Sequence, residues 1–286
     1  MTQPSTSLFA ILGHPVHHSL SPRMQNAAFR AAGRDAAYIA LDILPGQLAQ
    51  ALEGLHEIGF AGLNVTLPHK EEAFTLVDSA TPAARAAGAA NTLRRAPRGW
   101  EGDATDGAGF LAWLDALGLR APGARALLIG AGGAARSVAV ALAQREPAEI
   151  RIVNRTPERA ESLKALVLAA APLARVATGA WAGATDREGD AAAGGGWDFI
   201  VRALASEEVV PEERRWWGGL KPGGSLLDLN YGARAGAART EARSAGFRYE
   251  DGLGLLLEQG ALSFEFWTGT KAPREAMRGA LDSAEG

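Results

Sequence analysis

The stretch ALLIGAGGAARSVAVALA, residues 126–143, decides the fold of this chain. An apolar run leads into Gly130 and Gly132, and an alanine-rich segment typical of a helix follows. A strand that ends in a G-x-G-x-x-G/A turn and opens a helix indicates a dinucleotide-binding α/β domain. Gly130 permits the tight turn, Gly132 lets the backbone approach a pyrophosphate, and the helix N-terminus offers unpaired N–H groups to the phosphates.

The end of the next predicted strand, residues 149–155, indicates which dinucleotide binds. An NAD site usually carries an acid there, about 20 residues after the glycines, which bonds both ribose hydroxyls. This chain has Asn154, Arg155 and Thr156 instead, with no acid. We expect Arg155 to pair with a 2′-phosphate, Thr156 to donate to it and Arg159 to add charge from the same helix face. The pattern favours NADP, and the alternative is that Arg155 is only a solvated residue at a strand end.

Strand-like and helix-like segments alternate on both sides of the glycine motif, which indicates parallel strands with helical crossovers. The predicted strands are residues 7–13, 36–43, 60–66, 126–130, 149–155, 197–205 and 224–232. Residues 91–105 break this rhythm and are interpreted as a hairpin, and residues 185–196 as a polar, glycine-rich loop. The fold is therefore predicted to be α/β, with two open-sheet domains of which the second is Rossmann-type.

Length and composition limit the classes of function. A chain of 286 residues has room for two domains, and its net charge of −3 provides no basic surface for nucleic acid. The absence of cysteine excludes disulfides, thiolate catalysis and Cys-zinc sites. Neither a signal peptide nor an unbroken membrane-spanning stretch is found, so we expect a cytoplasmic protein without membrane contacts.

The densest polar cluster of the N-terminal third is NVTLPHK, residues 64–70, at the end of a predicted strand. Ligands of open α/β sheets bind at the carboxyl ends of strands. Asn64 and Thr66 alternate along the strand and therefore face the same side. Lys70 follows the turn, and a lysine, unlike an arginine, can release its proton. The alternative is that these residues only form the turn.

Asp106 stands at a predicted helix start, where an acid is often only an N-cap. The functional interpretation pairs it with Lys70, which keeps both groups charged and holds the ammonium in place. Reducing a ketone requires a proton for the developing alkoxide as hydride arrives, and a positioned lysine can supply it. On this functional interpretation, Lys70 and Asp106 form a catalytic pair.

The segment HPVHHSLSP, residues 14–22, holds three of the chain's five histidines. A metal site is not expected, because the segment contains no carboxylate and the chain has no cysteine to complete a ligand set. A serine nucleophile would need an orienting third group, which is not evident. Ser21 is instead expected to cap a helix that starts at Pro22.

Seven separated motifs follow one another along the chain. They are His18-Ser19-Leu20-Ser21-Pro22, Asn64-Val65-Thr66-Leu67-Pro68-His69-Lys70, Gly88-Ala89-Ala90-Asn91-Thr92, Thr105-Asp106-Gly107, Gly130-Ala131-Gly132-Gly133-Ala134, Asn154-Arg155-Thr156, and Gln259-Gly260-Ala261 with Trp267-Thr268-Gly269. Through them the chain resembles the shikimate dehydrogenase family over nearly its whole length. The resemblance implies NADPH-dependent, reversible reduction of 3-dehydroshikimate to shikimate, in the pathway to chorismate and the aromatic amino acids.

The resemblance also implies domains and residue roles. Residues 1–105, completed by returning C-terminal helices at 254–286, would bind substrate, and residues 106–253 would bind NADP, in a monomer or homodimer. Lys70 would be the acid/base, and Asp106 would form hydrogen bonds with both Lys70 and the substrate. The implied substrate-binding residues are Ser19, Ser21, Asn64, Thr66, Asn91, Tyr231 and Gln259. The cofactor-binding residues are Gly130, Ala131, Gly132, Gly133, Ala134, Asn154, Arg155, Thr156 and Arg159 from the motifs, with Leu229 and Gly252 from the resemblance.

The chain departs from the family pattern at three places, of which Ala90, where valine is usual, is a mild change. Ala104 stands where the family usually has asparagine, and Arg202-Ala203-Leu204 replaces Asn-Ala-Thr or Asn-Ala-Ser beside the cofactor. We hypothesise that Arg202 compensates by contacting a phosphate. Two alternatives remain open: a quinate/shikimate dehydrogenase that uses NAD(P), and a catalytically silent, NADP-binding regulatory protein. Retention of Lys70 and Asp106 argues against the second.

Overall fold

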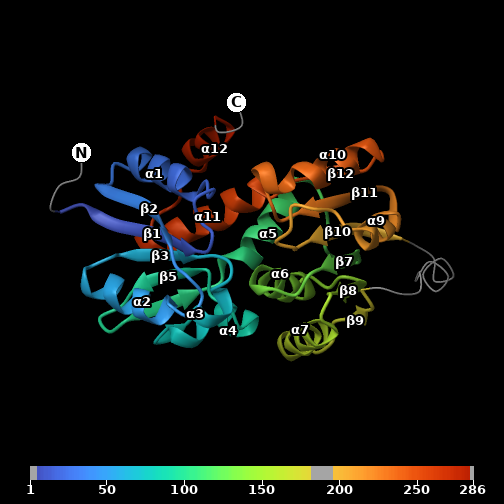
Figure 1. Ribbon diagram of the computed structural model, residues 1–286, viewed down its shortest axis with the longest axis horizontal. Coiled ribbons are helices and arrows are strands. Elements are labelled where there is room, and N and C mark those ends of the chain that lie inside the picture. The colour runs from blue at the N-terminus through green and yellow to red at the C-terminus, as the bar shows by residue number, and fades with distance from the viewer. Residues whose placement is uncertain (1–4, 182–195, 284–286) are drawn as a thin grey trace. The chain divides into compact units, whose positions relative to one another are not determined.

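The computed structural model describes residues 5–181 and 196–283. The chain forms two compact units, Met1–Ala112 with Leu255–Gly286, and Trp113–Gly254, and each contains a six-stranded sheet (Figure 1). The functional domain boundaries at 105/106 and 253/254 stay a prediction. Apart from Gly196, the predicted loop at 185–196 lies outside the described residues.

The sheet of the first unit has the strand order β2-β1-β3-β5-β6-β4. Its strands are β1 (Ser7–Gly13), β2 (Ala36–Asp42), β3 (Gly62–Val65), β4 (Ser79–Ala80), β5 (Thr92–Arg95) and β6 (Trp100–Asp103). Strand β1 is parallel to β2 and β3, whereas β5 is antiparallel to both β3 and β6. The β5–β6 pair confirms the predicted hairpin.

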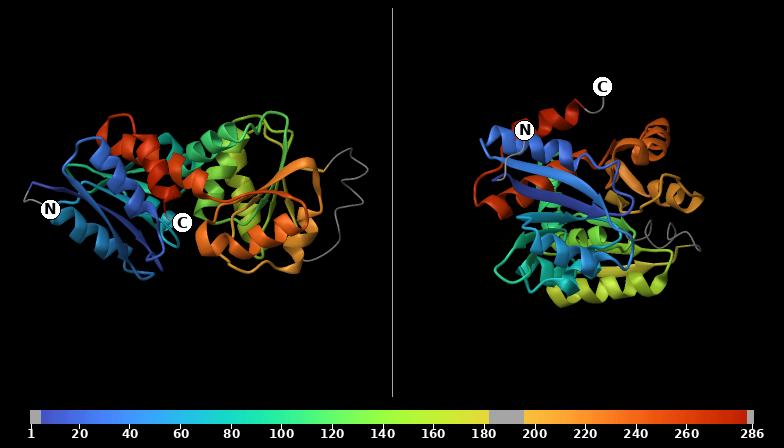
Figure 2. Two further views of the ribbon diagram at one scale, coloured as in Figure 1. Left: turned by 90° about the horizontal axis from the view of Figure 1, so that it is seen from above. Right: turned by 60° about the vertical axis from the view of Figure 1, so that its left-hand side comes forward.

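Helices from both ends of the chain complete this unit. They are α1 (Ser21–Ala31), α2 (Leu48–Glu57), α3 (Lys70–Leu76), α4 (Pro82–Ala87), the first part of α5 (Thr105–Ala116), nearly all of α11 (Leu253–Thr268), and α12 (Arg274–Asp282). Helix α12 lies beside α1 (Figure 2), and Arg23 of α1 donates to the carbonyl oxygen of Ser283. The predicted return of the C-terminal helices to the first domain is thus confirmed.

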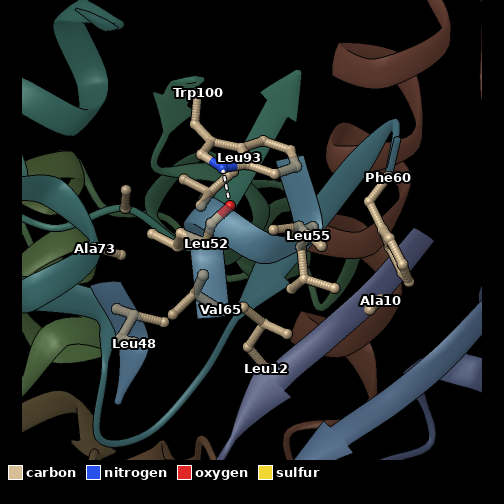
Figure 3. Packing of buried hydrophobic residues seen from close by; sticks show 12 residues of the cluster. Ala10, Leu12, Leu48, Leu52, Leu55, Phe60, Val65, Ala73, Leu93 and Trp100 are labelled. Atoms are coloured by element: carbon tan, nitrogen blue, oxygen red, sulfur yellow. Dashed lines mark hydrogen bonds between the residues drawn. The ribbon is translucent and has the colours of Figure 1, made fainter. Parts of the chain in front are cut away.

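Helix α2 provides the apolar layer on one face of this sheet. Leu48, Leu52 and Leu55 follow helical spacing and pack on buried strand residues such as Leu12 (Figure 3). The indole Nε1 of Trp100 donates to the carbonyl oxygen of Leu52 over 3.0 Å, so its one polar group is satisfied within the core. Burial of each leucine stabilises the unit by roughly 1.5–3 kcal/mol.

The start of α1 differs from the prediction. The helix begins at Ser21, its N-cap residue is Leu20, and the cap makes no side-chain hydrogen bond. The expected Ser21 cap ahead of a helix starting at Pro22 is therefore wrong. The physical reason is that the backbone N–H of Ser21 already donates to the hydroxyl of Ser19, over 3.2 Å, so the chain turns into the helix one residue earlier.

All strand pairs of the second sheet are parallel, in the order β12-β11-β10-β7-β8-β9. Its strands are β7 (Arg125–Ile129), β8 (Glu149–Val153), β9 (Val176–Gly179), β10 (Trp197–Arg202), β11 (Leu220–Asp228) and β12 (Arg248–Glu250). The connecting helices are α6 (Gly133–Ala143), α7 (Pro157–Ala170), α9 (Pro211–Trp217), the 3-10 helix η1 (Gly232–Ala235) and α10 (Gly236–Ser244). Central strand β7 leads into the glycine turn, with β8 on one side and β10 on the other, which confirms the Rossmann-type domain.

Candidate active site

Lys70 is the first residue of α3, directly after the turn that leaves β3. The turn is closed by the backbone N–H of His69, which donates to the carbonyl oxygen of Thr66 over 2.9 Å. The carbonyl oxygen of Lys70 accepts from the backbone N–H of Ala90, also over 2.9 Å. Two backbone hydrogen bonds therefore fix the position from which the lysine side chain projects.

The ammonium of Lys70 donates to the carboxylate of Asp106, with 2.6 Å between Nζ and Oδ2. Only 13% of the Lys70 side chain and 6% of the Asp106 side chain are exposed. Asp106 is the second residue of α5 rather than its N-cap, and lies in the first turn, where the helix dipole favours a carboxylate. A short charge-assisted bond between two nearly buried groups holds the ammonium in one place.

Asn91 and Gln259 complete the group around Asp106. The amide nitrogen of Asn91 lies 3.2 Å from Asp106 Oδ1 and 3.2 Å from Gln259 Oε1, and its amide oxygen accepts from the backbone N–H of Thr105 over 2.7 Å. Gln259 reaches this point because α11 packs tightly against α5. A Cβ atom at Gly109 would lie 2.6 Å from the backbone nitrogen of Gln259, so only glycine fits there.

Asn64 contacts this group through the backbone of Asn91 rather than through Lys70 or Asp106. Its amide oxygen accepts from the Tyr38 hydroxyl over 2.7 Å, and its amide nitrogen donates to the Asn91 carbonyl oxygen, Thr92 Oγ1 and Ser263 Oγ over 3.0–3.1 Å. The residue is 5% exposed. Both donors and the acceptor of Asn64 are thus engaged by the protein, and its visible role is to hold Asn91 and its neighbours in register.

Sequence reasoning missed the hydroxyl groups of this network. Ser263 Oγ lies 2.7 Å from Thr92 Oγ1 and 3.3 Å from Thr105 Oγ1, and it donates to the carbonyl oxygen of Gln259 over 3.0 Å. A signal was available, because Ser263 is one helical turn beyond Gln259 and Thr92 follows Asn91 directly. Their mutual contact spans most of the chain length, which no local pattern reveals.

Ser19, Ser21 and Thr66 lie at the carboxyl ends of neighbouring strands. The serines follow β1 and Thr66 follows β3, and these two strands pair in parallel. A Cβ atom at Gly13 would lie 2.3 Å from Thr66 Cγ2, so glycine allows the two segments to meet. Ser21 is buried, whereas Ser19 and Thr66 are half-buried. The three hydroxyl groups are thus supplied from the sheet edge that also carries Lys70.

In the second unit, the glycine turn has the shape that a pyrophosphate requires. Gly130 has φ +113°, and a Cβ atom there would lie 2.6 Å from the carbonyl oxygen of Ala203. A Cβ atom at Gly132 would meet nothing within 4 Å. Gly132 is the N-cap of α6 and provides no side-chain cap, so N–H groups of the first turn are left for a ligand. Ala131, Gly133 and Ala134 complete the turn.

The end of β8 lies beside this turn, because the backbone N–H of Gly130 donates to the carbonyl oxygen of Val153 over 2.8 Å. Arg155, Thr156 and Arg159 are exposed there, and Asn154 donates to the carbonyl oxygen of Thr156. The segment that leaves β8 presents cations and a hydroxyl group but no carboxylate before Glu158. This donor set fits a 2′-phosphate rather than a ribose diol.

Leu229 and Tyr231 follow β11 and Gly252 follows β12, at the carboxyl ends of two paired parallel strands of the second unit. Gly252 approaches Leu229 so closely that a Cβ atom would lie 2.4 Å from the Leu229 carbonyl oxygen. The backbone N–H of Gly252 also donates to the carbonyl oxygen of Asn230 over 2.8 Å. Tyr231 is half-buried and precedes η1. The roles assigned to these three residues stay predictions.

The hypothesis that Arg202 contacts a phosphate is wrong. Its side chain is fully buried, with Nε 2.6 Å from Glu213 Oε2 and Nη1 3.3 Å from Asp228 Oδ2. A guanidinium held by two buried carboxylates cannot also reach a ligand phosphate.

Another departure from the family pattern, Ala104, packs in a cluster of small buried residues. Its neighbours there are Ala84, Ala87 and Ala89. An alanine suits this apolar environment, because a buried amide would need hydrogen-bonding partners.

His14, in the segment 14–22, pairs with a carboxylate from another part of the chain, with 2.9 Å between its Nδ1 and Asp42 Oδ1. Within residues 5–181 and 196–283, no three histidine, aspartate or glutamate side chains are grouped so that they could hold a metal ion. Over the same ranges, none of the helices combines the length and hydrophobicity that crossing a membrane requires.

Comparison with known proteins gives matches along almost the whole chain. Three family models match: shikimate dehydrogenase substrate binding domain at residues 11–93, shikimate / quinate 5-dehydrogenase at residues 116–177, and shikimate 5′-dehydrogenase C-terminal domain at residues 252–281. The shikimate dehydrogenase (NADP(+)) of Anaeromyxobacter dehalogenans is 45% identical over 285 residues, 98% of each chain. That of Moorella thermoacetica is 42% identical, over 99% of this chain and 95% of the relative.

Solved structures agree with these matches. Shikimate 5-dehydrogenase from Thermus thermophilus, in complex with NADP(H) and shikimate, has a TM-score of 0.77 at 32% identity, covering 98% of this chain and 100% of that one. The 5-ketofructose reductase of a Gluconobacter species has a TM-score of 0.81 at 29% identity, covering 99% of this chain and 100% of that one.

Proposed function

The chain belongs to the shikimate dehydrogenase family, and from that membership and its site we propose that it catalyses the NADPH-dependent, reversible reduction of 3-dehydroshikimate to shikimate. The observation that carries the proposal is the pair formed by Lys70 and Asp106, 2.6 Å apart and nearly buried. A protein that only sensed the nucleotide would have no use for a matched acid/base pair.

Lys70 supplies the proton of the reaction. As the ketone is reduced, negative charge develops on its oxygen, and the ammonium donates a proton to that atom. In the reverse direction the neutral amine removes the proton from the hydroxyl group. Asp106 orients the ammonium through its Oδ2 and bonds a substrate hydroxyl group, while Asn91 holds its Oδ1.

The remaining polar residues of the first unit bind the substrate. Ser19 and Ser21 hold the carboxylate, near the N-terminus of α1, whose dipole favours an anion. Thr66, Asn91 and Gln259 bind the carboxylate and the ring hydroxyl groups. Asn64 acts mainly by positioning Asn91, since its own amide is engaged. Tyr231 contributes a further substrate contact.

The second unit binds the cofactor, which supplies the hydride when bound. The backbone of residues 130–134 and the first turn of α6 hold the pyrophosphate. Asn154, Arg155, Thr156 and Arg159 form the 2′-phosphate site, which makes NADP the preferred nucleotide. The backbones of Leu229 and Gly252 line the nicotinamide half. A cytoplasmic location and a monomeric or homodimeric state stay predictions.

Oxidation assays that follow the ultraviolet absorbance of the reduced nicotinamide test this proposal. The purified protein is given NADP with shikimate, then with quinate, and each assay is repeated with NAD. The reverse assay offers NADPH with 3-dehydroshikimate or 5-ketofructose. The proposal requires shikimate with NADP to have the highest kcat/KM of the oxidation assays, and 3-dehydroshikimate that of the reductions. Preference for quinate or 5-ketofructose would reassign the substrate, and inactivity with intact NADP binding would indicate a regulatory protein.

A further inference from the structure

Arg202 is the centre of a buried polar cluster in the second unit. Its guanidinium donates to Glu213 on α9 over 2.6 Å, to Asp228 at the end of β11 over 3.3 Å, and to the carbonyl oxygens of Ser206 and Glu208 over 3.0 and 2.9 Å. The side chains of Arg202, Glu213 and Asp228 are 0–1% exposed. One arginine thus ties together a strand end, a helix and the loop that follows its own strand.

The cluster is completed around Asp228. This carboxylate also accepts from the Tyr249 hydroxyl over 3.0 Å, and from Asn230 through both its backbone N–H and its side-chain amide. Burial raises the pKa of Asp228, against the opposing charge of Arg202. The pKa of Tyr249 is also raised, by burial and by the neighbouring Asp228. Four acceptors from three parts of the chain thus hold the Arg202 guanidinium.

The loop that Arg202 fixes lies against the glycine turn. The backbone N–H of Ala203 donates to the carbonyl oxygen of Ile129 over 2.8 Å, and a Cβ atom at Gly130 would lie only 2.6 Å from the Ala203 carbonyl oxygen. Asn230, held by Asp228, donates to the carbonyl oxygen of Leu204 over 2.7 Å. Residues 203 and 204 therefore lie against the turn, and Arg202 holds the same loop through the carbonyl oxygens of Ser206 and Glu208.

We propose that Arg202 is a positioning residue for the nicotinamide cofactor, because its guanidinium fixes residues 203–208 against the glycine turn before the cofactor binds. This inference rests on the proposed function for the identity of the cofactor. An arginine in this role contributes through preorganisation and not through contact. If the loop is ordered only a fraction of the time, the apparent affinity for the cofactor equals the intrinsic affinity multiplied by that fraction.

The test separates preorganisation from general stability with two variants. Arg202→Met removes the guanidinium and leaves two buried carboxylates unpaired, so it lowers the melting temperature. The triple variant Arg202→Met/Glu213→Gln/Asp228→Asn removes these charges and recovers most of the melting temperature, but it still lacks donors to the carbonyl oxygens of Ser206 and Glu208. Arg214→Met is the matched control. Arg214 lies on α9, as Glu213 does, but it forms its ion pair with Glu241 on the surface.

The readouts are the Kd for NADPH, from fluorescence titration without substrate, and amide hydrogen exchange of residues 203–208 in the cofactor-free protein. We expect the triple variant to bind NADPH about tenfold more weakly than the wild type, with faster exchange in the loop, and the Arg214 control to match the wild type. A triple variant with the wild-type Kd overturns the inference, whether or not the single variant folds. Because the titration needs no turnover, failure to oxidise shikimate would count against the proposed function alone, whereas a wild type that does not bind NADPH would remove both.

Discussion

The Nζ atom of Lys70 and the Oδ2 atom of Asp106 lie 2.6 Å apart, in a setting that is almost closed to solvent. The pair joins the first turn of α3 to the first turn of α5, so the start of a helix determines the position of each side chain. This arrangement gives the proton donor a fixed position before substrate binds.

Replacement of Lys70 by alanine is expected to lower kcat by roughly 10²–10⁴-fold, the contribution usual for general acid–base catalysis. The KM for shikimate should stay within about tenfold, because proton transfer is needed mainly in the transition state. Steady-state kinetics measure both quantities, with Lys271→Ala, at an exposed lysine, as the control. A large rise in KM with an unchanged kcat would contradict the acid/base role.

Single replacements of Ser19 and Ser21 by alanine should raise the KM for shikimate, since each removes a donor to the carboxylate. A hydrogen bond to a charged group contributes about 1.5–3 kcal/mol, which corresponds to a rise of roughly ten- to a hundredfold. The KM for NADP should not change. An unaltered KM for shikimate in both variants would remove the serines from the binding site.

Arg155→Asp places an acid where the chain has a cation at the end of β8. We expect the KM for NADP to rise at least about tenfold, because a favourable phosphate contact becomes a repulsion. The KM for NAD should fall or stay constant, since the new carboxylate can accept from a ribose diol. Arg98→Asp, in the exposed β5–β6 turn, is the matched control. If both cofactors lose affinity equally, Arg155 does not read the 2′-phosphate.

Ser263→Ala tests the buried hydroxyl network. Ser263 is fully buried and exchanges hydrogen bonds with Asn64, Thr92 and Gln259, so its loss leaves polar partners unsatisfied. The free energy of unfolding should fall by about 1–3 kcal/mol, measured by denaturant titration against Ser244→Ala, an exposed control. A stability equal to that of the wild type would show that the network rearranges without cost.

Asp228→Asn tests the buried charge cluster through pH. Burial raises the pKa of Asp228, so the folded protein binds this proton more tightly than the unfolded chain. The resulting stability is complete below the unfolded pKa of about 3.9 and is lost as the pH rises through the higher folded pKa. The melting temperature of the variant relative to the wild type should therefore increase as the pH rises.

The control for this experiment is Asp282→Asn, at an exposed position. Its melting temperature relative to the wild type should change little over the same pH range. If the relative melting temperature of Asp228→Asn is independent of pH, or decreases as pH rises, the carboxyl group of Asp228 is not the group whose pKa is raised.

The parts of the fold that the sequence predicts are those with local signals. The glycine turn at 130–132, the exit of β3 before Lys70 and the start of α5 at Asp106 each combine an apolar run with turn or helix-start chemistry. The short strands β4, β9 and β12, of two to four residues, were not predicted, because so few residues show no periodicity.

Long-range pairings account for what the sequence did not predict. The interpretation of Arg202 failed because its partners Glu213 and Asp228 follow 11 and 26 residues later. The residues around the end of a strand contain no signal that predicts such distant partners. Likewise, Ser263 contacts Thr92 across 171 residues of chain. Such contacts exist only once the packing of the helices and strands is known.

The close packing at Gly109 has a consequence for altering this enzyme. The backbone of Gln259 comes this close only because position 109 has no side chain, so under the substrate-binding role proposed for Gln259 a position without any functional group affects specificity. Adding a single methyl group there would displace one wall of the site while leaving each of its polar residues intact. Libraries that seek new substrates for this scaffold should therefore vary the helix contact at 109 before the residues that touch the ligand.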